Sequence, residues 1–276
     1  MAVRLVVRVW RLMALGLAVC VAPVGVAAGD APLRIGGTGM ALAAMRQIGD
    51  SLRTAAPDIR VEVMPSLGTP GGLRALAARA IDIAVAGRNL TAEEQATGLV
   101  EAGCATTPLL FASSHPAPAG IRLADLPTLY ANPGPAWPDS TPLKIILRSR
   151  AGSENGYLVA LGPAMAPALE HAYKRSGVPI ATTDQENAEI AVRTAGSFAM
   201  MSLLQVRAER LDLRLVTVDG ITPAVAAVAD KTYPMSASIC LVLPAAPKPA
   251  ATAFVAHLRS EAGRALIASL GATPFE

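Results

Sequence analysis

An apolar stretch near the middle of the chain ends in two arginines and a run of small residues. Residues 145–147 are typical of a buried strand, and residues 154–161 favour a helix. A strand that feeds a helix through a short loop leaves backbone N–H groups unpaired, and these groups and the helix dipole attract anions. Guanidinium groups add charge and a planar set of donors. The segment therefore predicts an oxyanion site formed by Arg148 or Arg150 with Gly152 and Ser153, although an ordinary strand–helix connection with surface arginines fits equally well.

Three strand-like segments nearer the N-terminus also end in loops rich in glycine, serine and threonine. These segments are residues 33–35, 59–64 and 82–86, and helical sequence follows each loop. In an open α/β sheet, the loops at the carboxyl ends of the strands meet at the ligand crevice. Helix capping by the threonines and a surface position for the arginine are the alternatives. The candidate ligand residues in these loops are Thr38, Gly39, Thr69, Gly71 and Arg88.

The remaining sequence continues the alternation of strands and helices that is typical of an α/β fold. A strand over residues 106–113 leads to a crossing point between two lobes near Ser113, and a strand over residues 236–243 brings the chain back. The predicted lobes are residues 29–112 with 233–276, and residues 113–232. Helices are expected over residues 123–130, 165–176, 186–194 and 223–229, strands over 197–201 and 213–218, and one long amphipathic helix over 249–270.

The N-terminus predicts export from the cytoplasm. Arg4, Arg8 and Arg11 precede an apolar run over residues 12–26, and small residues follow it. This pattern is typical of a secretory signal peptide over residues 1–28, cleaved after Ala28, and it predicts a periplasmic protein. A lipid anchor at Cys20 is the weaker alternative, because a valine precedes that cysteine and the apolar run continues past it.

Removing the signal peptide leaves a chain without excess charge. The full sequence has 24 Lys and Arg and 21 Asp and Glu, and loss of three arginines makes the two groups equal. A near-neutral chain does not favour binding to nucleic acid or to acidic membranes. His, Cys, Asp and Glu show no metal-binding spacing, and no cofactor is predicted. In an oxidising compartment Cys104 and Cys240 are expected to form a disulfide or to remain as two buried thiols.

Several segments, taken in order, resemble the phosphate-binding proteins of bacterial ABC importers, in the type II periplasmic-binding-protein superfamily. The Gly37–Met40 segment resembles the first ligand loop, and residues 66–73 are similar to the family's G-S-S-G-G loop. Residues 82–90 match its D-I-G-x-A-S-R-x-L loop most closely. Residues 148–155 resemble the R-x-x-G-S-G-T anion loop, which adds Met40 and Asn155 to the candidate ligand residues.

This resemblance implies a two-lobed α/β fold with a mixed sheet in each lobe and a two-strand hinge. The implied function is capture of a small oxyanion, phosphate above all, by a monomer that delivers it to the membrane permease of an ABC importer. Two departures affect the site. Gly87 stands where the family has Asp or Ser, and Glu154-Asn155 replaces Gly-Thr. A carboxylate beside the site repels a dianion unless it accepts a proton from it or points away.

Two other functional classes remain open. A ligand-sensing or assembly protein could keep the scaffold with altered anion binding. A serine hydrolase would use Ser153, but the sequence around it is not the G-x-S-x-G elbow, and no motif places a histidine beside it. We therefore predict that the protein is not an enzyme. We also expect that replacing a cleft arginine leaves the stability of the empty protein little changed.

Overall fold

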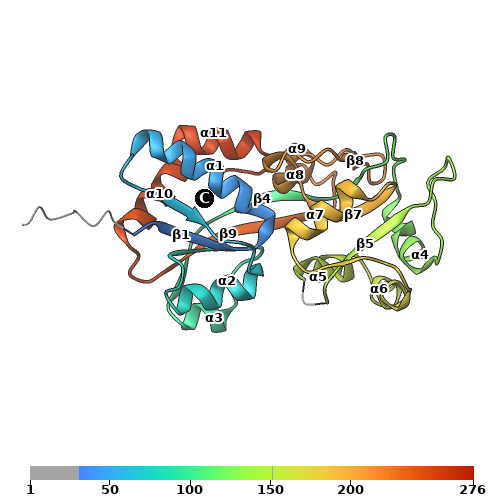
Figure 1. Cartoon of the computed structure of the whole chain (residues 1–276), viewed down its shortest axis with the longest axis horizontal. Helices are drawn as coiled ribbons and strands as arrows, with labels where there is room; N and C mark the ends of the chain where they lie inside the picture. Colours follow the sequence, from blue (N-terminus) through green and yellow to red (C-terminus); the bar gives the residue numbers. More distant parts are fainter. Residues whose placement is uncertain (1–30, 151) are drawn as a thin grey trace, which may run out of the picture.

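The computed structural model describes residues 31–150 and 152–276, which form two α/β lobes side by side (Figure 1). The predicted signal peptide and Cys20 lie outside the described residues. The strands follow one path in the order β2-β1-β3-β9-β4-β7-β5-β6, with β8 paired to β4. Within the described part of the chain, no helix is both long and apolar enough to cross a membrane.

The sheet of the first lobe is mixed. Its strand β1 (Leu33–Gly37) is parallel to its two neighbours β2 (Val61–Val63) and β3 (Ile83–Ala86), while β9 (Ser236–Pro244) is antiparallel to β3. The helices α1 (Gly39–Ala55), α10 (Pro249–Arg259) and α11 (Glu261–Ser269) lie on one face. The helices α2 (Gly68–Ala77) and α3 (Ala92–Ala96) lie on the other face. One face of α1 is apolar and buried, which attaches this helix to the core.

The sheet of the second lobe is also mixed. Here β5 (Lys144–Arg148) is parallel to β7 (Ser197–Ser202) and to β6 (Ile180–Ala181), while β8 (Arg214–Val216) is antiparallel to β4 (Leu99–Ser113). Short helices connect and cover these strands: η1 (Leu123–Asp125), α4 (Leu126–Ala131), α5 (Ser153–Ala160), α6 (Met165–Lys174), α7 (Asp184–Arg193), α8 (Leu203–Ala208) and α9 (Val225–Ala229).

The long strand β4 belongs to both sheets. Its residues 99–108 pair with β9, and its residues 109–113 pair with β7 and β8. The chain therefore passes from one sheet to the other inside a continuous strand. The residue boundaries of the two lobes, 29–112 with 233–276 and 113–232, stay a prediction.

Two expectations about secondary structure were wrong. The strand predicted over residues 106–113 begins at Leu99, because its first half is a half-exposed strand without a continuous apolar run. The helix predicted over residues 249–270 is broken at Ser260, which has extended backbone angles and accepts a hydrogen bond from the Gly263 N–H. The serine is thus the N-cap of a second helix, so the apolar pattern continues although the helix axis does not.

A disulfide joins Cys104 of β4 to Cys240 of β9. The two residues are direct partners in the antiparallel pair, and their Cα atoms are 4.1 Å apart. The structure therefore contains the disulfide rather than two buried thiols, which were the two alternatives left open by the sequence. Glu101 lies within 4.8 Å of both sulfur atoms, but sulfur atoms bonded to each other are not thiolate ligands for a metal ion.

Candidate functional site

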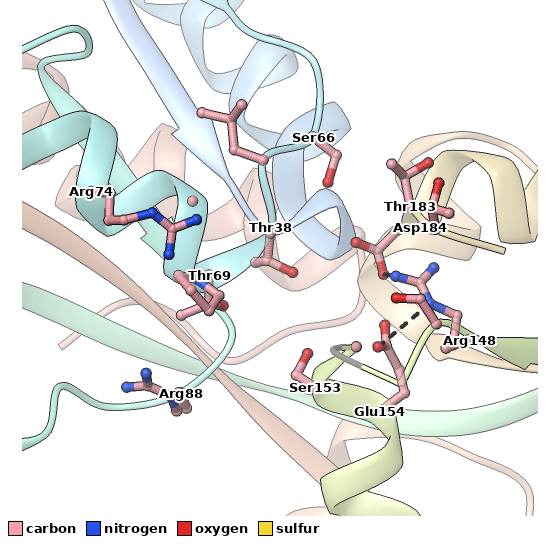
Figure 2. A pocket seen from close by; sticks show the side chains of 17 residues that line it. Thr38, Ser66, Thr69, Arg74, Arg88, Arg148, Ser153, Glu154, Thr183 and Asp184 are labelled. Atoms are coloured by element: carbon pink, nitrogen blue, oxygen red, sulfur yellow. Dashed lines mark ion pairs between the residues drawn. The ribbon is translucent and has the colours of Figure 1, made fainter.

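A cavity of about 540 Å³ is lined by loops of both lobes (Figure 2). Most of its polar lining residues come from strand–helix junctions and the first turns of helices, while Arg74 comes from the last turn of α2 (Gly68–Ala77). Seven of the predicted ligand residues meet here: Thr38, Thr69, Gly71, Arg88, Arg148, Gly152 and Ser153. The lining also includes Ser66, Leu67, Gly68, Pro70, Arg74, Ser149, Glu154, Thr182, Thr183 and Asp184.

The first-lobe wall is built from two helix N-termini. Thr38 is the N-cap of α1, but its side chain makes no capping hydrogen bond, so its hydroxyl is not used by the helix. The first turn of α2 lies close to the end of β1, since a Cβ atom at Gly72 would lie 2.6 Å from the Gly37 Cα. Only a glycine allows this approach, which brings Thr69 to the cavity. The Thr69 hydroxyl accepts a hydrogen bond of 2.8 Å from the Gly87 N–H.

The space beside Gly87 is already filled. A Cβ atom there would lie 2.8 Å from Met40 Cε and 3.3 Å from the Thr69 hydroxyl. Met40 is fully buried beneath the wall. The prediction that Met40 and Gly39 contact the ligand is therefore not met, because neither residue lines the cavity. The methionine thus takes the place into which a family-type Asp or Ser side chain would project.

The second-lobe wall carries a residue group that the sequence did not reveal. β5 ends at Arg148 and α5 begins at Ser153, as expected. The additional residues are Thr182, Thr183 and Asp184, at the junction between β6 and α7. They follow the same strand–loop–helix pattern as the other loops. However, β6 has only two residues, which is too short to give an apolar signal.

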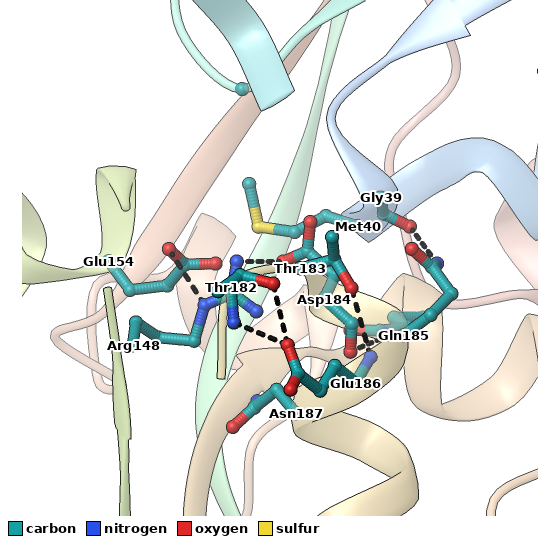
Figure 3. Close-up of polar contacts among 12 residues, drawn as sticks. Gly39, Met40, Arg148, Glu154, Thr182, Thr183, Asp184, Gln185, Glu186 and Asn187 are labelled. Carbon is teal, nitrogen blue, oxygen red and sulfur yellow. Dashed lines mark hydrogen bonds and ion pairs between the residues drawn. The ribbon is translucent and has the colours of Figure 1, made fainter. Parts of the chain in front are cut away.

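Arg148 lies between two carboxylates on this wall (Figure 3). Its Nε atom is 3.5 Å from Glu154 Oε2, and its Nη2 atom is 3.5 Å from Asp184 Oδ1. All three side chains are at most 7% exposed. Nevertheless, Arg148 Nε and Nη1 and Glu154 Oε2 have no hydrogen-bond partner among the described residues. The cluster therefore holds both donors and an acceptor that a ligand could use.

Burial raises the pKa of the Glu154 carboxyl to about 8, and the negative charge of Asp184 adds to this effect, while Arg148 opposes it. Because a buried site with two carboxylates and one cation disfavours a second negative charge, a proton is retained on Glu154 at neutral pH. Protonated Glu154 is then a hydrogen-bond donor as well as an acceptor.

Arg88 reaches the cavity but is already paired. Its two terminal nitrogens donate to the two carboxylate oxygens of Glu94 at 2.8 Å each. This guanidinium lowers the pKa of Glu94 to about 2. Glu94 also closes a capping box with Thr91 at the start of α3, so the position of Arg88 is fixed by a helix terminus.

Arg150 and Asn155 lie away from this cavity. Arg150 forms an ion pair with Glu170, lies 4.2 Å above the ring of Tyr173, and lines a separate surface hollow with Asn155. The Asn155 amide donates to the Ser149 carbonyl at 2.8 Å. Of the two arginines, Arg148 is thus the one at the cavity. It is buried rather than exposed, so the reason for expecting that its loss leaves stability little changed does not apply to Arg148.

Comparisons with known proteins place this fold. Residues 22–262 match the family model described as PBP superfamily domain. No curated protein matches the sequence. At identities of 14–17%, the likeness of solved structures shows the fold alone.

Three solved structures illustrate that likeness. The first is a Clostridium perfringens protein classed as a phosphate ABC transporter substrate-binding protein, with bound phosphate (TM-score 0.70, 17% identity, 89% of this chain and 100% of that chain). The second is the periplasmic phosphate-binding protein PfluDING with phosphate (TM-score 0.65, 14% identity, 88% of this chain and 90% of that chain). The third is an ABC-type phosphate transport receptor from Vibrio cholerae (TM-score 0.57, 16% identity, 87% of this chain and 99% of that chain). With its family match spanning most of the sequence, the chain belongs to the PBP superfamily.

Proposed function

We propose that the protein is a solute-binding protein that captures a small oxyanion, phosphate above all, between its two lobes. The observation that carries the proposal is the convergence on one cavity of the N-termini of α2 and α5, the hydroxyl of Thr38 and the buried guanidinium of Arg148. Helix N-termini and arginine are the groups that proteins use to bind oxyanions. Phosphate is favoured because three structures with this fold carry names that refer to phosphate binding or transport.

The same proposal covers location and partners. A signal peptide over residues 1–28 would deliver a monomer to the periplasm, where it would hand its ligand to the permease of an ABC importer. A lipid anchor at Cys20 is the weaker alternative. In this proposal Ser153 binds the ligand and is not a nucleophile. No histidine is among the residues that line the described cavity.

The first test compares two neighbouring arginines. Arg148→Gln removes the guanidinium at the cavity, whereas the matched control Arg150→Gln removes one that is paired with Glu170 elsewhere. A hydrogen bond to a charged group contributes about 1.5–3 kcal/mol, so we expect Arg148→Gln to weaken phosphate binding roughly tenfold to a hundredfold in calorimetry. Arg150→Gln should bind like the unmodified protein.

A thermal-shift screen with phosphate, sulfate, molybdate, phosphonates and carboxylates gives the ligand class. A ligand at a hundredfold excess over its Kd adds about 2.7 kcal/mol to the unfolding free energy. Circular dichroism should first establish that Arg148→Gln is folded, because it leaves two carboxylates facing each other. Equal binding by both arginine variants would place the anion elsewhere, and the absence of any stabilising oxyanion would contradict the function.

A further inference from the structure

The two walls of the cavity differ in charge (Figure 2). The first-lobe wall carries Arg74 and Arg88, and it has no carboxylate among the lining residues that the structure describes. The second-lobe wall carries Glu154 and Asp184 around Arg148. A ligand that fits this cavity therefore meets a cationic side and a side on which carboxyl groups outnumber the cation.

The carboxylate of Asp184 occupies the N-terminus of α1. A Cβ atom at Gly39 would lie 2.6 Å from Asp184 Oδ2, so this oxygen abuts the first turn of the helix. The other oxygen, Oδ1, faces Arg148. The α1 dipole and one edge of the guanidinium therefore already face a negative group of the protein. The oxyanion of a ligand is thereby directed toward the first turn of α2 and toward Arg74.

When Glu154 is ionised, the formal charges around the cavity balance without a ligand. Its three arginines are Arg74, Arg88 and Arg148, and they are matched by Glu154 and Asp184 on the wall and by Glu94, which binds Arg88. With Glu154 protonated, as in the empty protein at neutral pH, one positive charge is in excess, so a dianion placed in this cavity would still carry one uncompensated charge near buried carboxyl groups. A ligand that brings its own cation avoids this penalty.

The size of the cavity also favours a ligand larger than inorganic phosphate. A volume of about 540 Å³ lies within the range of about 300–1,000 Å³ that is common for pockets holding small organic molecules. A water molecule takes up about 30 Å³ in the liquid, so a tetrahedral anion with five heavy atoms fills only a small part of the cavity. The remaining space reaches Glu154, whose Oε2 atom lacks a hydrogen-bond partner among the described residues.

Building on the oxyanion site proposed above, we propose that the ligand is a short aminoalkyl phosphonate or phosphate ester rather than inorganic phosphate. Its phosphorus oxyanion lies at the first turn of α2 with Thr69 and Arg74, and its ammonium group lies against Glu154 and Asp184. The two carboxyl groups then select for the amino group. Arg148 holds them in place, and its Nε and Nη1 groups, which are unpaired within the part of the chain that the structure describes, remain available to the oxyanion.

The test uses ligands that differ only in the amino group. Calorimetry near pH 7 compares 2-aminoethylphosphonate with ethylphosphonate, and inorganic phosphate serves as the third probe. We expect 2-aminoethylphosphonate to bind roughly tenfold to a hundredfold more tightly than ethylphosphonate, because the ammonium group gains charge-assisted hydrogen bonds. Equal affinities, or tighter binding of inorganic phosphate, would overturn this inference and leave the oxyanion function intact. Binding of none of the three would overturn both.

Variants of the two carboxyl groups assign the preference to this wall. Asp184→Asn and Glu154→Gln keep the side-chain shape but cannot carry a negative charge beside an ammonium group. Each should therefore reduce the preference for the amino ligand about tenfold, while ethylphosphonate binds as well as before or better. Glu170→Gln is the matched control, because Glu170 pairs with Arg150 outside the cavity. If both substitutions strengthen both phosphonates by the same factor, the carboxyl groups only compete with the ligand for Arg148, and the inference fails.

Discussion

Arg148 and its two carboxyl partners form the chemical centre of the cavity. Their side chains are buried, but the distances of 3.5 Å are longer than those of strong charge-assisted hydrogen bonds. The pairing compensates the buried charges only in part, and the ligand can supply the remaining contacts. A suitable ligand is therefore expected to stabilise these three side chains by completing their hydrogen bonds.

Glu154 gives this cluster a measurable dependence on pH. Its pKa of about 8 lies above the ordinary carboxyl value of 4.5, so the folded protein binds more protons than the unfolded chain between these values. The resulting stabilisation is present below about pH 4.5 and is lost as the pH rises through 8.

We therefore expect the unfolding free energy of the empty protein to fall by a few kcal/mol more between pH 5 and pH 8 than that of Glu154→Gln. Urea titrations at pH 5, 6.5 and 8 measure this difference. Glu170→Gln should behave like the unmodified protein, because Glu170 is exposed and its pKa is lowered by Arg150. If the unfolding free energies of the unmodified protein and Glu154→Gln change in parallel with pH, Glu154 is not the source of the pH dependence.

Strand–helix junctions bring the site together at the scale of the element. β1, β5 and β6 each end at a loop that begins a helix, and the side chains of these loops face one cavity. Gly72 allows α2 to approach β1 closely, and Thr69 then links this helix to the third loop through Gly87. The disulfide between β4 and β9 lies behind that loop, since Ala86 is the partner of Cys240 on the other side of β9.

Removal of this disulfide should destabilise the protein. The crosslink joins residues 136 positions apart, and closing a long loop restricts the unfolded chain strongly. We expect the double substitution Cys104→Ser and Cys240→Ser to lower the unfolding free energy by about 2–4 kcal/mol in guanidinium titrations. Because the two serines still fit the paired strands, ligand affinity in the folded state should change by less than about threefold. An unchanged midpoint would argue that the cysteines are not bonded in the native protein.

At the scale of the whole molecule, hydrogen bonds connect the lobes around the cavity. The Tyr157 hydroxyl of α5 donates to the Gly87 carbonyl at 2.5 Å, and the Gln185 amide of α7 donates to the Gly39 carbonyl at 3.1 Å (Figure 3). These contacts favour a closed arrangement without lining the cavity themselves. Because a closed arrangement retains a bound ligand, they should affect the rate of ligand release.

We expect Tyr157→Phe to weaken ligand binding about fivefold, mainly through faster dissociation, because it removes one neutral hydrogen bond worth about 1 kcal/mol. Stopped-flow measurements separate the two rate constants. Tyr233→Phe is the control, since the Tyr233 hydroxyl is buried without a hydrogen-bond partner in the described part of the chain. Equal dissociation rates for the two variants would show that the Tyr157 contact does not hold the lobes together.

The sequence by itself determined the α/β alternation, the strand–loop–helix segments and the candidate arginines. These features are local, because apolar periodicity and small-residue loops depend on neighbours in the chain. Thr38, Thr69 and Arg148 were found in this way. The short strand β6 gave no such signal, and the break at Ser260 leaves the apolar pattern intact, so both were missed.

Only the tertiary structure decided how these parts meet. It placed Arg148 at the cavity and Arg150 beside Glu170, although the two arginines are only two residues apart at the end of β5. It also brought Asp184 of α7 against Gly39 of α1, which are 145 positions apart in the sequence. The direction of a side chain and the approach of distant loops depend on how the sheets pack. The charge balance around Arg148 is therefore a property of the fold rather than of any one segment.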